Sequence, residues 1–301
     1  MQERTLETAK PVRRSKLVEM EQAADLVKDG MMISVGGNHS HEAPCAFARE
    51  LVRRGIKDLT LVPSNAAGYQ ADILIGAGCV KTLYNSYCGL DYVGAAPNFR
   101  RFAESGRLDV LELDEMGLMR GLKASVAGVA FYPLPDGFLG VDVWKVSPDF
   151  YRVIEDPFTG KKVVVVPPIR PDICIVHVPK CDVYGNAIEP GVLDNVLHQA
   201  ANRVIVTTDE IVPLEYTRAH HTEVTIMGKF VSAVVKVPYG AHPGQCTGQY
   251  THDDQHMREY QAAGKDDESF RKYLEQYVLG KSNEQYLESV GISRLLKLKY
   301  Y

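Results

Sequence analysis

The segment DGMMISVGGNHSHEAP, from Asp29 to Pro44, predicts a buried strand that ends in a Gly-Gly turn and leads through a polar loop into a helix. Because Gly36 and Gly37 lack a Cβ atom, the chain can turn sharply there, and a polar ligand atom can come close to the main chain. Pro44 suits the first turn of a helix, whose free N–H groups would face the same loop. This layout predicts a binding loop at the end of a core strand.

Around this segment, helical and strand periodicities alternate along the chain. The alternation predicts an α/β fold of three α/β/α layers, with a mainly parallel sheet covered by helices on both faces. Strands are predicted at 31–35, 59–62, 80–84, 110–113, 163–166, 173–177, 204–207 and 231–237. Helices are predicted at 19–29, after Pro44, and at 71–75, 98–104, 116–129 and 194–201.

The sequence shows no linker or repeat, so we expect a single domain over residues 1–301 with a C-terminal helical cap at about 255–301. The stretch from Pro133 to Lys161 is rich in Pro, Gly and aromatic residues. Such a stretch is typical of an excursion from the sheet. We expect it to serve as a lid or as a subunit contact.

Composition excludes several classes of function. With a net charge of -4 and a pI near 6.2, the chain has no basic field for a phosphate backbone, so a nucleic-acid partner is disfavoured. The apolar runs are much shorter than the roughly 20 residues that a membrane helix needs. The 6 cysteines are scattered without C-x-x-C spacing, which favours reduced thiols in a cytoplasmic protein.

Ordered segments along most of the chain resemble one protein family. Asp29, Gly30, Gly36, Gly37 and Pro44 fit the first signature of the class I coenzyme A (CoA) transferases. Further matches to the α subunit of glutaconate CoA transferases are 72–81, 156–158, 170–177, 182–186 and 238–248. Three residues of the first segment depart from the signature: Ser34, Asn38 and Glu42. These departures suggest a different ligand in the loop.

The resemblance implies a CoA-transferase-like fold and the α half of a heteromeric enzyme. In that family the attacking glutamate belongs to a β subunit or to the second half of a fused chain, and the CoA moves between an acyl-CoA and a small mono- or dicarboxylic acid by ping-pong chemistry. The implied partners are therefore a β subunit, a CoA thioester as substrate and a carboxylic acid. No permanently bound cofactor is implied.

The expected pocket residues lie on three segments of the chain. Loop ends at the carboxyl termini of strands are where open α/β sheets bind ligands. The pocket would be built from Gly36, Gly37, Asn38, His39, Ser64, Asn65, Gly240, His242 and Gln245. For the 240–248 segment, a tight turn at a subunit interface is an equally open interpretation.

Glu115 carries the alternative function. It falls on the position of an acidic residue in the α subunit of the steroid ring-opening CoA hydrolases, which this chain also resembles. A Glu in a dry cleft can act as a general base, so Glu115 would then be the catalytic residue of a hydrolase or a carbon–carbon lyase. Alternatively, Asp114 and Glu115 only lead a helix and complement its dipole. A third possibility is a non-catalytic ligand-sensing domain, because related folds serve in sugar-phosphate-responsive repressors.

Metal-ligand residue types occur in two groups, but neither has ordered spacing. The first group is His39, His41 and Glu42, and the second is Cys246, His252, Asp253, Asp254 and His256. Because loops fix no ligand geometry, we expect no metal at either group. Cys45 begins a helix and could be a low-pKa thiol, but a small buried residue is the favoured interpretation.

Overall fold

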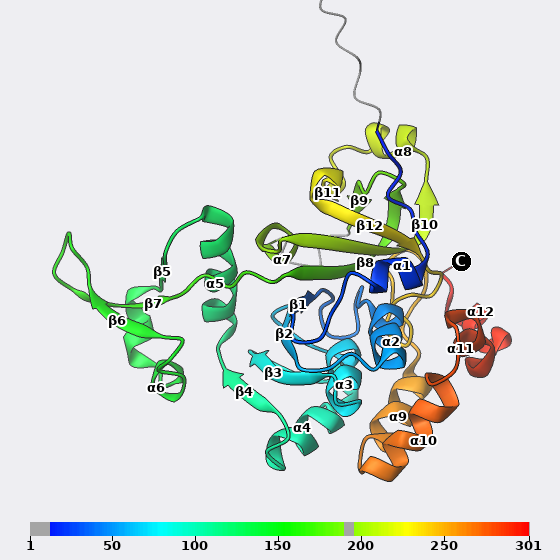
Figure 1. Cartoon of the computed structure of the whole chain (residues 1–301), viewed down its shortest axis with the longest axis horizontal. Coiled ribbons are helices and arrows are strands. Elements are labelled where there is room, and N and C mark those ends of the chain that lie inside the picture. Colours follow the sequence, from blue (N-terminus) through cyan, green and yellow to red (C-terminus); the bar gives the residue numbers. More distant parts are fainter. Residues whose placement is uncertain (1–12, 190–195, 301) are drawn as a thin grey trace, which may run out of the picture.

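The computed structural model describes residues 13–189 and 196–300 (Figure 1). Within these residues, nine strands form a central sheet in the order β11-β9-β8-β1-β2-β3-β4, with β10 beside β8 and β12 beside β10. The strands are β1 (Met32–Val35), β2 (Leu59–Pro63), β3 (Val80–Asn85), β4 (Asp109–Glu112), β8 (Ile173–Asp182), β9 (Ala187–Ile188), β10 (Arg203–Val212), β11 (Val224–Ile226) and β12 (Val231–Lys236).

The strand pairs of the central sheet are parallel except those of β9, which runs antiparallel to β8 and to β11. The predicted mainly parallel sheet is therefore confirmed. The short antiparallel edge was not predicted, because β9 and β11 contain only two and three residues and show no periodicity.

Alternate residues of the central strands enter two hydrophobic clusters, one on each face of the sheet. Along β8, Ile173 and Ile175 belong to the first cluster, whereas Cys174 and Val176 belong to the second. Helices α2 (Cys45–Arg54) and α3 (Tyr69–Gly76) cover the first face, and α5 (Glu115–Ala127) and α7 (Val196–Ala200) cover the second. The remaining helices of the body are α1 (Met20–Ala24), α4 (Pro97–Glu104) and α8 (Leu214–Ala219). This arrangement matches the three predicted layers.

Helix α2 follows directly from its sequence. Phe47 and Leu51 are four residues apart, so they share one face of the helix, and both are fully buried. Gly55 adopts a φ of 63° and ends the helix with the left-handed cap that its lack of a Cβ allows.

The C-terminal helices pack on the same side as α2 and α3. They are α9 (Asp254–Ala263), α10 (Asp267–Tyr277), α11 (Asn283–Val290) and α12 (Ile292–Leu298). Their tyrosines Tyr260, Tyr273 and Tyr286 enter the first hydrophobic cluster. The C-terminal helical cap is therefore present, at the lower right of Figure 1.

A separate three-stranded antiparallel sheet projects from the body (Figure 1). It contains β5 (Tyr132–Pro133), β6 (Arg152–Glu155) and β7 (Lys162–Val166), with the short helix α6 (Val143–Val146). We call residues 132–166 the arm. Assigning 163–166 to the central sheet was wrong, because β7 pairs with β5 and β6. A valine-rich run predicts a strand but cannot say which sheet it joins.

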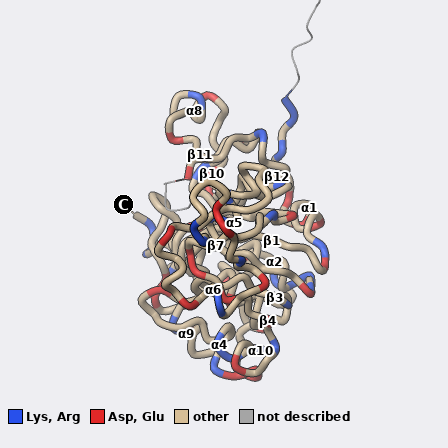
Figure 2. The backbone as a smooth tube through the Cα atoms, turned by 90° about the vertical axis from the view of Figure 1, so that its left-hand side faces the viewer, with Lys and Arg blue, Asp and Glu red and all other residues tan. Residues whose placement is uncertain are grey.

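The arm is attached to the start of α5. Tyr151 Oη donates a hydrogen bond to Asp114 Oδ1 at 2.6 Å, and Ser147 Oγ donates to the carbonyl oxygen of Glu112 at 2.6 Å. Viewed from the arm side, acidic and basic residues are interspersed (Figure 2). None of the helices in the described parts of the chain has the length and apolar character needed to span a membrane.

Candidate functional site

Two loops meet at the carboxyl ends of the central strands. We call residues 36–44 the glycine loop and residues 238–250 the second loop. Gln245 N–H donates to Ser40 O at 2.7 Å, and Glu42 N–H donates to Gln245 O at 3.0 Å. The side chains of His41 and Gln245 also approach to 2.7 Å, between Nδ1 and Nε2. The structure thus brings Gln245, from far along the chain, against the segment that contains Gly36, Gly37, Asn38 and His39.

The path of the main chain itself requires a glycine at position 37. Its φ is 90°, and a Cβ placed on it would lie 2.5 Å from Ala43 Cα, just before α2. Only glycine therefore allows the turn to close on the beginning of that helix. The sequence pattern suggested close approach of a ligand, whereas the structure shows close approach of the chain to itself.

Backbone strain is concentrated around the glycine loop. The described chain contains five non-glycine residues with positive φ, and two of them, His39 (53°) and Glu42 (46°), lie in the glycine loop. A third, Tyr239 (54°), belongs to the second loop, and a fourth, Asp91 (54°), accepts a hydrogen bond from Ser40 Oγ at 3.0 Å. Such conformations cost energy and are typical of functional sites.

Several buried polar atoms at the glycine loop have no hydrogen-bond partner within the described structure. They are Asn38 Oδ1, His39 Nδ1, Glu42 Oε2 and Gln70 Oε1. Gln70 Nε2 donates to Gly36 O at 3.1 Å, which holds the amide beside the turn. Because buried polar groups are almost always paired, this group of unused atoms is consistent with a polar ligand or water at the loop.

Two side chains that follow β2 connect the glycine loop to the start of α5. They are Ser64 and Asn65, and the residue that Asn65 reaches in α5 is Glu115. Ser64 Oγ donates to the carbonyl oxygen of Gly37, and Asn65 Nδ2 donates to Glu115 Oε1 at 2.9 Å. Asp114, not Glu115, caps α5, because its carboxylate accepts from the N–H groups of Met116 and Gly117, both at 3.0 Å. The exposed Glu115 is therefore free of the capping role and faces Asn65.

Gly240 and His242 lie beside these loops, but in different roles. The carbonyl oxygen of Gly240 accepts the N–H of Ala46, in the first turn of α2, at 2.8 Å. The His242 ring is fully buried, with Nδ1 2.7 Å from Tyr286 Oη and Nε2 3.1 Å from Asp253 Oδ2. The expectation that the His242 side chain lines the pocket does not fit this geometry, because the ring faces the C-terminal helices.

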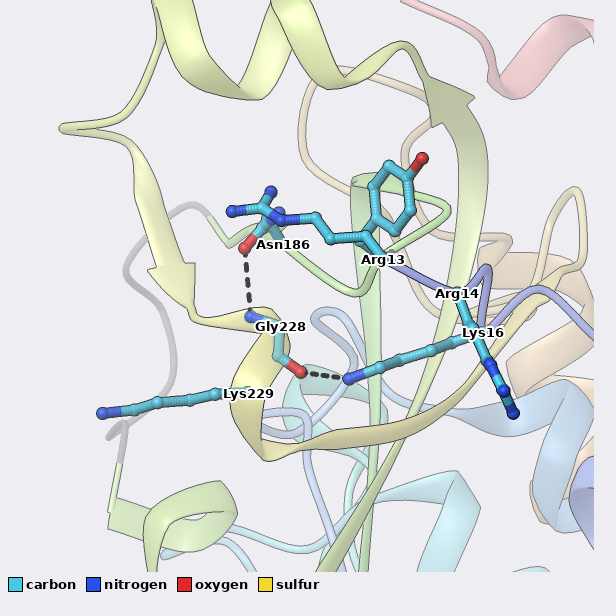
Figure 3. A pocket seen from close by; sticks show the side chains of 7 residues that line it. Arg13, Arg14, Lys16, Asn186, Gly228 and Lys229 are labelled. Carbon is cyan, nitrogen blue, oxygen red and sulfur yellow. Dashed lines mark hydrogen bonds between the residues drawn. The ribbon is translucent and has the colours of Figure 1, made fainter. Parts of the chain in front are cut away.

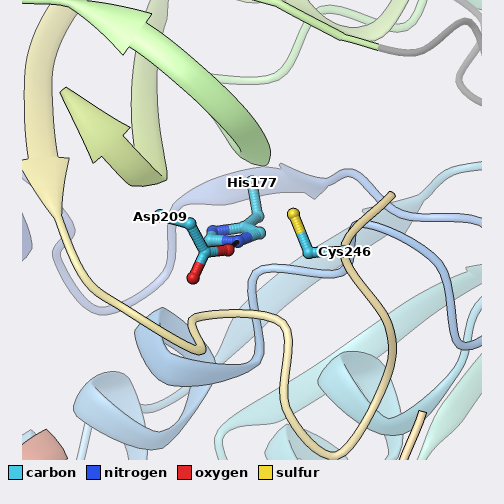
Figure 4. A group of neighbouring side chains, drawn as sticks. All are labelled: His177, Asp209 and Cys246. Atoms are coloured by element: carbon cyan, nitrogen blue, oxygen red, sulfur yellow. Dashed lines mark hydrogen bonds and ion pairs between the residues drawn. The ribbon is translucent and has the colours of Figure 1, made fainter. Parts of the chain in front are cut away.

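The second group of possible metal ligands is divided by the fold. The His256 ring is buried, with Nε2 2.8 Å from Tyr273 Oη, whereas Cys246 lies next to His177 and Asp209 (Figure 4). The ligand atoms of these three residues lie within 4.8 Å of one another. Both ring nitrogens of His177 already have protein partners, so this is a hydrogen-bonded group in the structure.

Cys45 does not have the properties of a catalytic thiol. Its side chain is fully buried at the start of α2. Burial raises the pKa of the Cys45 thiol to about 12, which suppresses the reactive thiolate at neutral pH. The small buried interpretation is therefore the one that the structure supports.

A basic cavity of about 300 Å³ lies elsewhere and contains none of the predicted site residues (Figure 3). Its lining includes Arg13, Arg14, Lys16 and Lys229. Lys16 Nζ donates to the carbonyl oxygens of Gly228 at 2.5 Å and Val231 at 2.6 Å, which fastens the N-terminal segment to the start of β12.

Comparison with known proteins identifies the class that this fold and site define. The model of a family described as "Coenzyme A transferase" matches residues 17–237. A glutaconate CoA-transferase subunit of Acidaminococcus fermentans is 34% identical, over 95% of each chain. The crystal structure of the glutaconate enzyme from that organism superposes with a TM-score of 0.88 over 95% of this chain and 96% of the other, at 33% identity. This protein belongs to the coenzyme A transferase family.

Two further relatives show the range of similar proteins. An uncharacterized protein of Archaeoglobus fulgidus is 35% identical over 92% of this chain, and the match spans 62% of that longer protein. The cholesterol ring-cleaving hydrolase IpdA subunit of Rhodococcus jostii is 28% identical over 90% of this chain and 95% of its own length. Family membership favours an enzyme over the ligand-sensing alternative.

Proposed function

We propose that this chain is the α subunit of a heteromeric CoA transferase that moves CoA between an acyl-CoA and a small mono- or dicarboxylic acid. The observation that carries the proposal is the group of unused polar atoms at the glycine loop, set where parallel strands end. The 34% identity to a glutaconate CoA-transferase subunit, over 95% of both chains, supports the same function.

The nucleophile in this proposal is a glutamate of a β subunit. Its carboxylate attacks the thioester carbonyl and expels CoA thiolate, which leaves an acyl-glutamyl anhydride. The thiolate then attacks the glutamyl carbonyl, so the acyl group leaves as a carboxylate and a glutamyl-CoA thioester forms. The acceptor acid repeats these steps in reverse, which restores the glutamate and gives the new acyl-CoA.

This chain would supply the wall that holds the reacting groups. The glycine loop lies against Ser64, and the Asn65 amide lies at the end of β2. Hydrogen-bond donors that are already fixed in place stabilise the oxyanion of each tetrahedral intermediate without further ordering. The arm, with Phe158 exposed at the β6–β7 turn, is proposed as a lid or subunit contact beside Glu115. The six free cysteines are consistent with a cytoplasmic location, which we propose as well.

A hydrolase or carbon–carbon lyase is the second candidate, and Glu115 favours it. Glu115 is exposed, and its Oε1 accepts a hydrogen bond from Asn65 Nδ2. A carboxylate in that position would act as a base on water or on an acidic carbon once a partner subunit excludes bulk water. The 28% identity to a ring-cleaving hydrolase subunit fits this candidate.

The deciding experiment uses the chain co-expressed and purified with its β subunit. The complex is incubated with glutaryl-CoA and isotope-labelled acetate, and the products are followed by mass spectrometry. Labelled acetyl-CoA together with a CoA adduct on a β-subunit glutamate would support the transferase. Free CoA without labelled acetyl-CoA or adduct would overturn it in favour of the Glu115 chemistry. The same complex with the β-subunit glutamate changed to Ala is the control.

A further inference from the structure

Asp209 is the point at which the second loop is fastened to the central sheet. It lies in β10, and its Oδ1 accepts the N–H of Tyr239 at 2.6 Å. Its Oδ2 accepts the hydroxyl of Tyr250 at 3.2 Å, and that hydroxyl oxygen accepts the N–H of Ala241 at 2.9 Å. One carboxylate therefore holds the loop near both of its ends.

His177, on the neighbouring strand β8, holds Asp209 in turn (Figure 4). Its Nε2 lies 2.8 Å from Asp209 Oδ2, and its Nδ1 lies 2.9 Å from Thr207 Oγ1. Thr207 Oγ1 also donates to Val176 O at 3.0 Å. Because both ring nitrogens are engaged and the ring is fully buried, its orientation is fixed.

The main chain of the second loop packs closely against this histidine ring. A Cβ placed on Gly240 would lie 2.4 Å from His177 Cε1, so the loop main chain passes directly over the ring. The carbonyl oxygen of Gly240 also accepts the N–H of Ala46 in α2. Gly240 of the second loop therefore contacts the His177 ring on one side and the first turn of α2 on the other.

Beyond Gly240 the second loop is paired with the glycine loop. The main-chain bonds between Gln245 and the residues Ser40 and Glu42 form a short ladder, and Thr247 N–H donates to Glu42 Oε1 at 2.7 Å. A shift of the second loop would move all three contacts. Within the described residues, the hydrogen bonds of Asp209 go to His177, Tyr239 and Tyr250 and none goes to the glycine loop, so it acts through the second loop.

We propose that Asp209, oriented by His177, is a positioning residue that holds the second loop, and through it the glycine loop, in the arrangement of the candidate site. The effect on catalysis rests on the proposed function, whereas the effect on the two loops does not. Cys246 completes the buried group, but a thiol is too weak a hydrogen-bonding group to replace the histidine in orienting the carboxylate.

Asp182 provides a matched control. Its side chain is fully buried, and that of Asp209 is only 7% exposed. The Asp182 carboxylate accepts from the N–H groups of Tyr184 and Asn186, from Asn186 Nδ2 and from Thr217 Oγ1. These contacts hold the β8–β9 turn and do not touch either loop. Asp182→Asn therefore reports the general cost of changing a buried, fully bonded aspartate.

The test is hydrogen exchange followed by mass spectrometry on the purified complex. In Asp209→Asn, amides of peptides spanning 38–43 and 239–250 should exchange about tenfold faster or more, because local opening becomes easier. Tyr250→Phe, which keeps the aromatic packing, should give the same pattern more weakly. In Asp182→Asn, faster exchange should be confined to peptides around 182–188 and the contact with Thr217.

Unchanged exchange in both loops of folded Asp209→Asn and Tyr250→Phe would overturn the proposal, as would equal loosening of every peptide in all three variants. Activity is a second readout. At matched thermal stability, Asp209→Asn should lower kcat/KM at least about tenfold and Asp182→Asn less than about threefold. If the loops loosen but the wild-type complex transfers no CoA, the positioning role stands and the proposed function fails.

Discussion

The side-chain amide of Asn65 donates a 2.9 Å hydrogen bond to the carboxylate of Glu115, and this bond joins the end of β2 to the first residue of α5. Because Asp114 already caps α5, Glu115 is not needed to begin the helix. The two candidate functions therefore give Glu115 different roles: it is the catalytic base of a hydrolase or lyase, but it has no chemical role in a transferase.

Changing Glu115 to Gln separates these functions. In a transferase whose nucleophile belongs to the β subunit, Glu115→Gln should leave CoA transfer within about threefold of wild type, because a glutamine oxygen can still accept from Asn65. In a hydrolase or lyase the same change should lower kcat by at least about a hundredfold, since the base is lost. Rates of CoA transfer and of CoA release, measured on the same complex, decide the matter.

Gly37→Ala should destabilise the chain and displace the glycine loop. The new Cβ would collide with Ala43 at 2.5 Å and would occupy a φ of 90°, so we expect a loss of about 2–4 kcal/mol of unfolding free energy. Gly30→Ala is the matched control, because Gly30 has a φ of 76° but nothing within 4 Å of the added Cβ. Urea unfolding of both variants checks this, and equal losses would contradict the steric argument.

His198 should make stability depend on pH. Burial lowers the pKa of His198 to about 4, whereas the unfolded chain titrates near 6.5. Above about pH 6.5 both states carry a neutral ring. As pH falls from there, the unfolded state takes up the proton first, so unfolding free energy declines, by on the order of 3 kcal/mol at pH 4.

The measurement is urea unfolding of wild type and His198→Gln between about pH 7.5 and 4.5. The difference in unfolding free energy between the two proteins should shrink as the solution becomes more acidic, since only wild type loses the contribution of His198. Burial also lowers the pKa values of His242 and His256, but these residues act equally in both proteins. Parallel curves would exclude the assignment.

Arg49 should be more important for stability than an exposed arginine. It is fully buried, donates to His242 O at 2.8 Å and to Asn283 Oδ1 at 3.3 Å, and its guanidinium carbon lies 3.6 Å from the centroid of the Tyr286 ring. Arg49→Met would leave two buried acceptors without a donor, which we expect to cost about 2–4 kcal/mol. Arg100→Met, at an exposed ion pair with Glu104, should leave thermal unfolding unchanged.

The sheet could be predicted from local pattern, because the core strands carry apolar runs of their own and helix-period segments separate them. The glycine loop was also predictable, since residues 29–44 contain the strand, the turn and the helix start in one stretch. The arm was predicted only as an excursion. Its strands are short, and β5 pairs with a strand far along the chain that no period reveals.

The partners of the second loop could not be predicted. His177 and Asp209 meet because β8 and β10 are neighbours, and nothing in either strand marks the residue that will face the loop. His242 was expected in the pocket, yet its ring is hydrogen-bonded to Tyr286 and Asp253 and faces the C-terminal helices. Single-domain organisation and the catalytic roles of the site residues remain predictions.

Helix α11, besides covering the sheet, surrounds the buried guanidinium of Arg49. A guanidinium carries a hydration shell in water, and the interior offers none. In this chain a carbonyl oxygen, an amide oxygen and the face of Tyr286 take the place of that shell, and two of the three are supplied by α11. Helix α11 and the second loop thus replace water around a charge that lies one turn into the helix following the glycine loop.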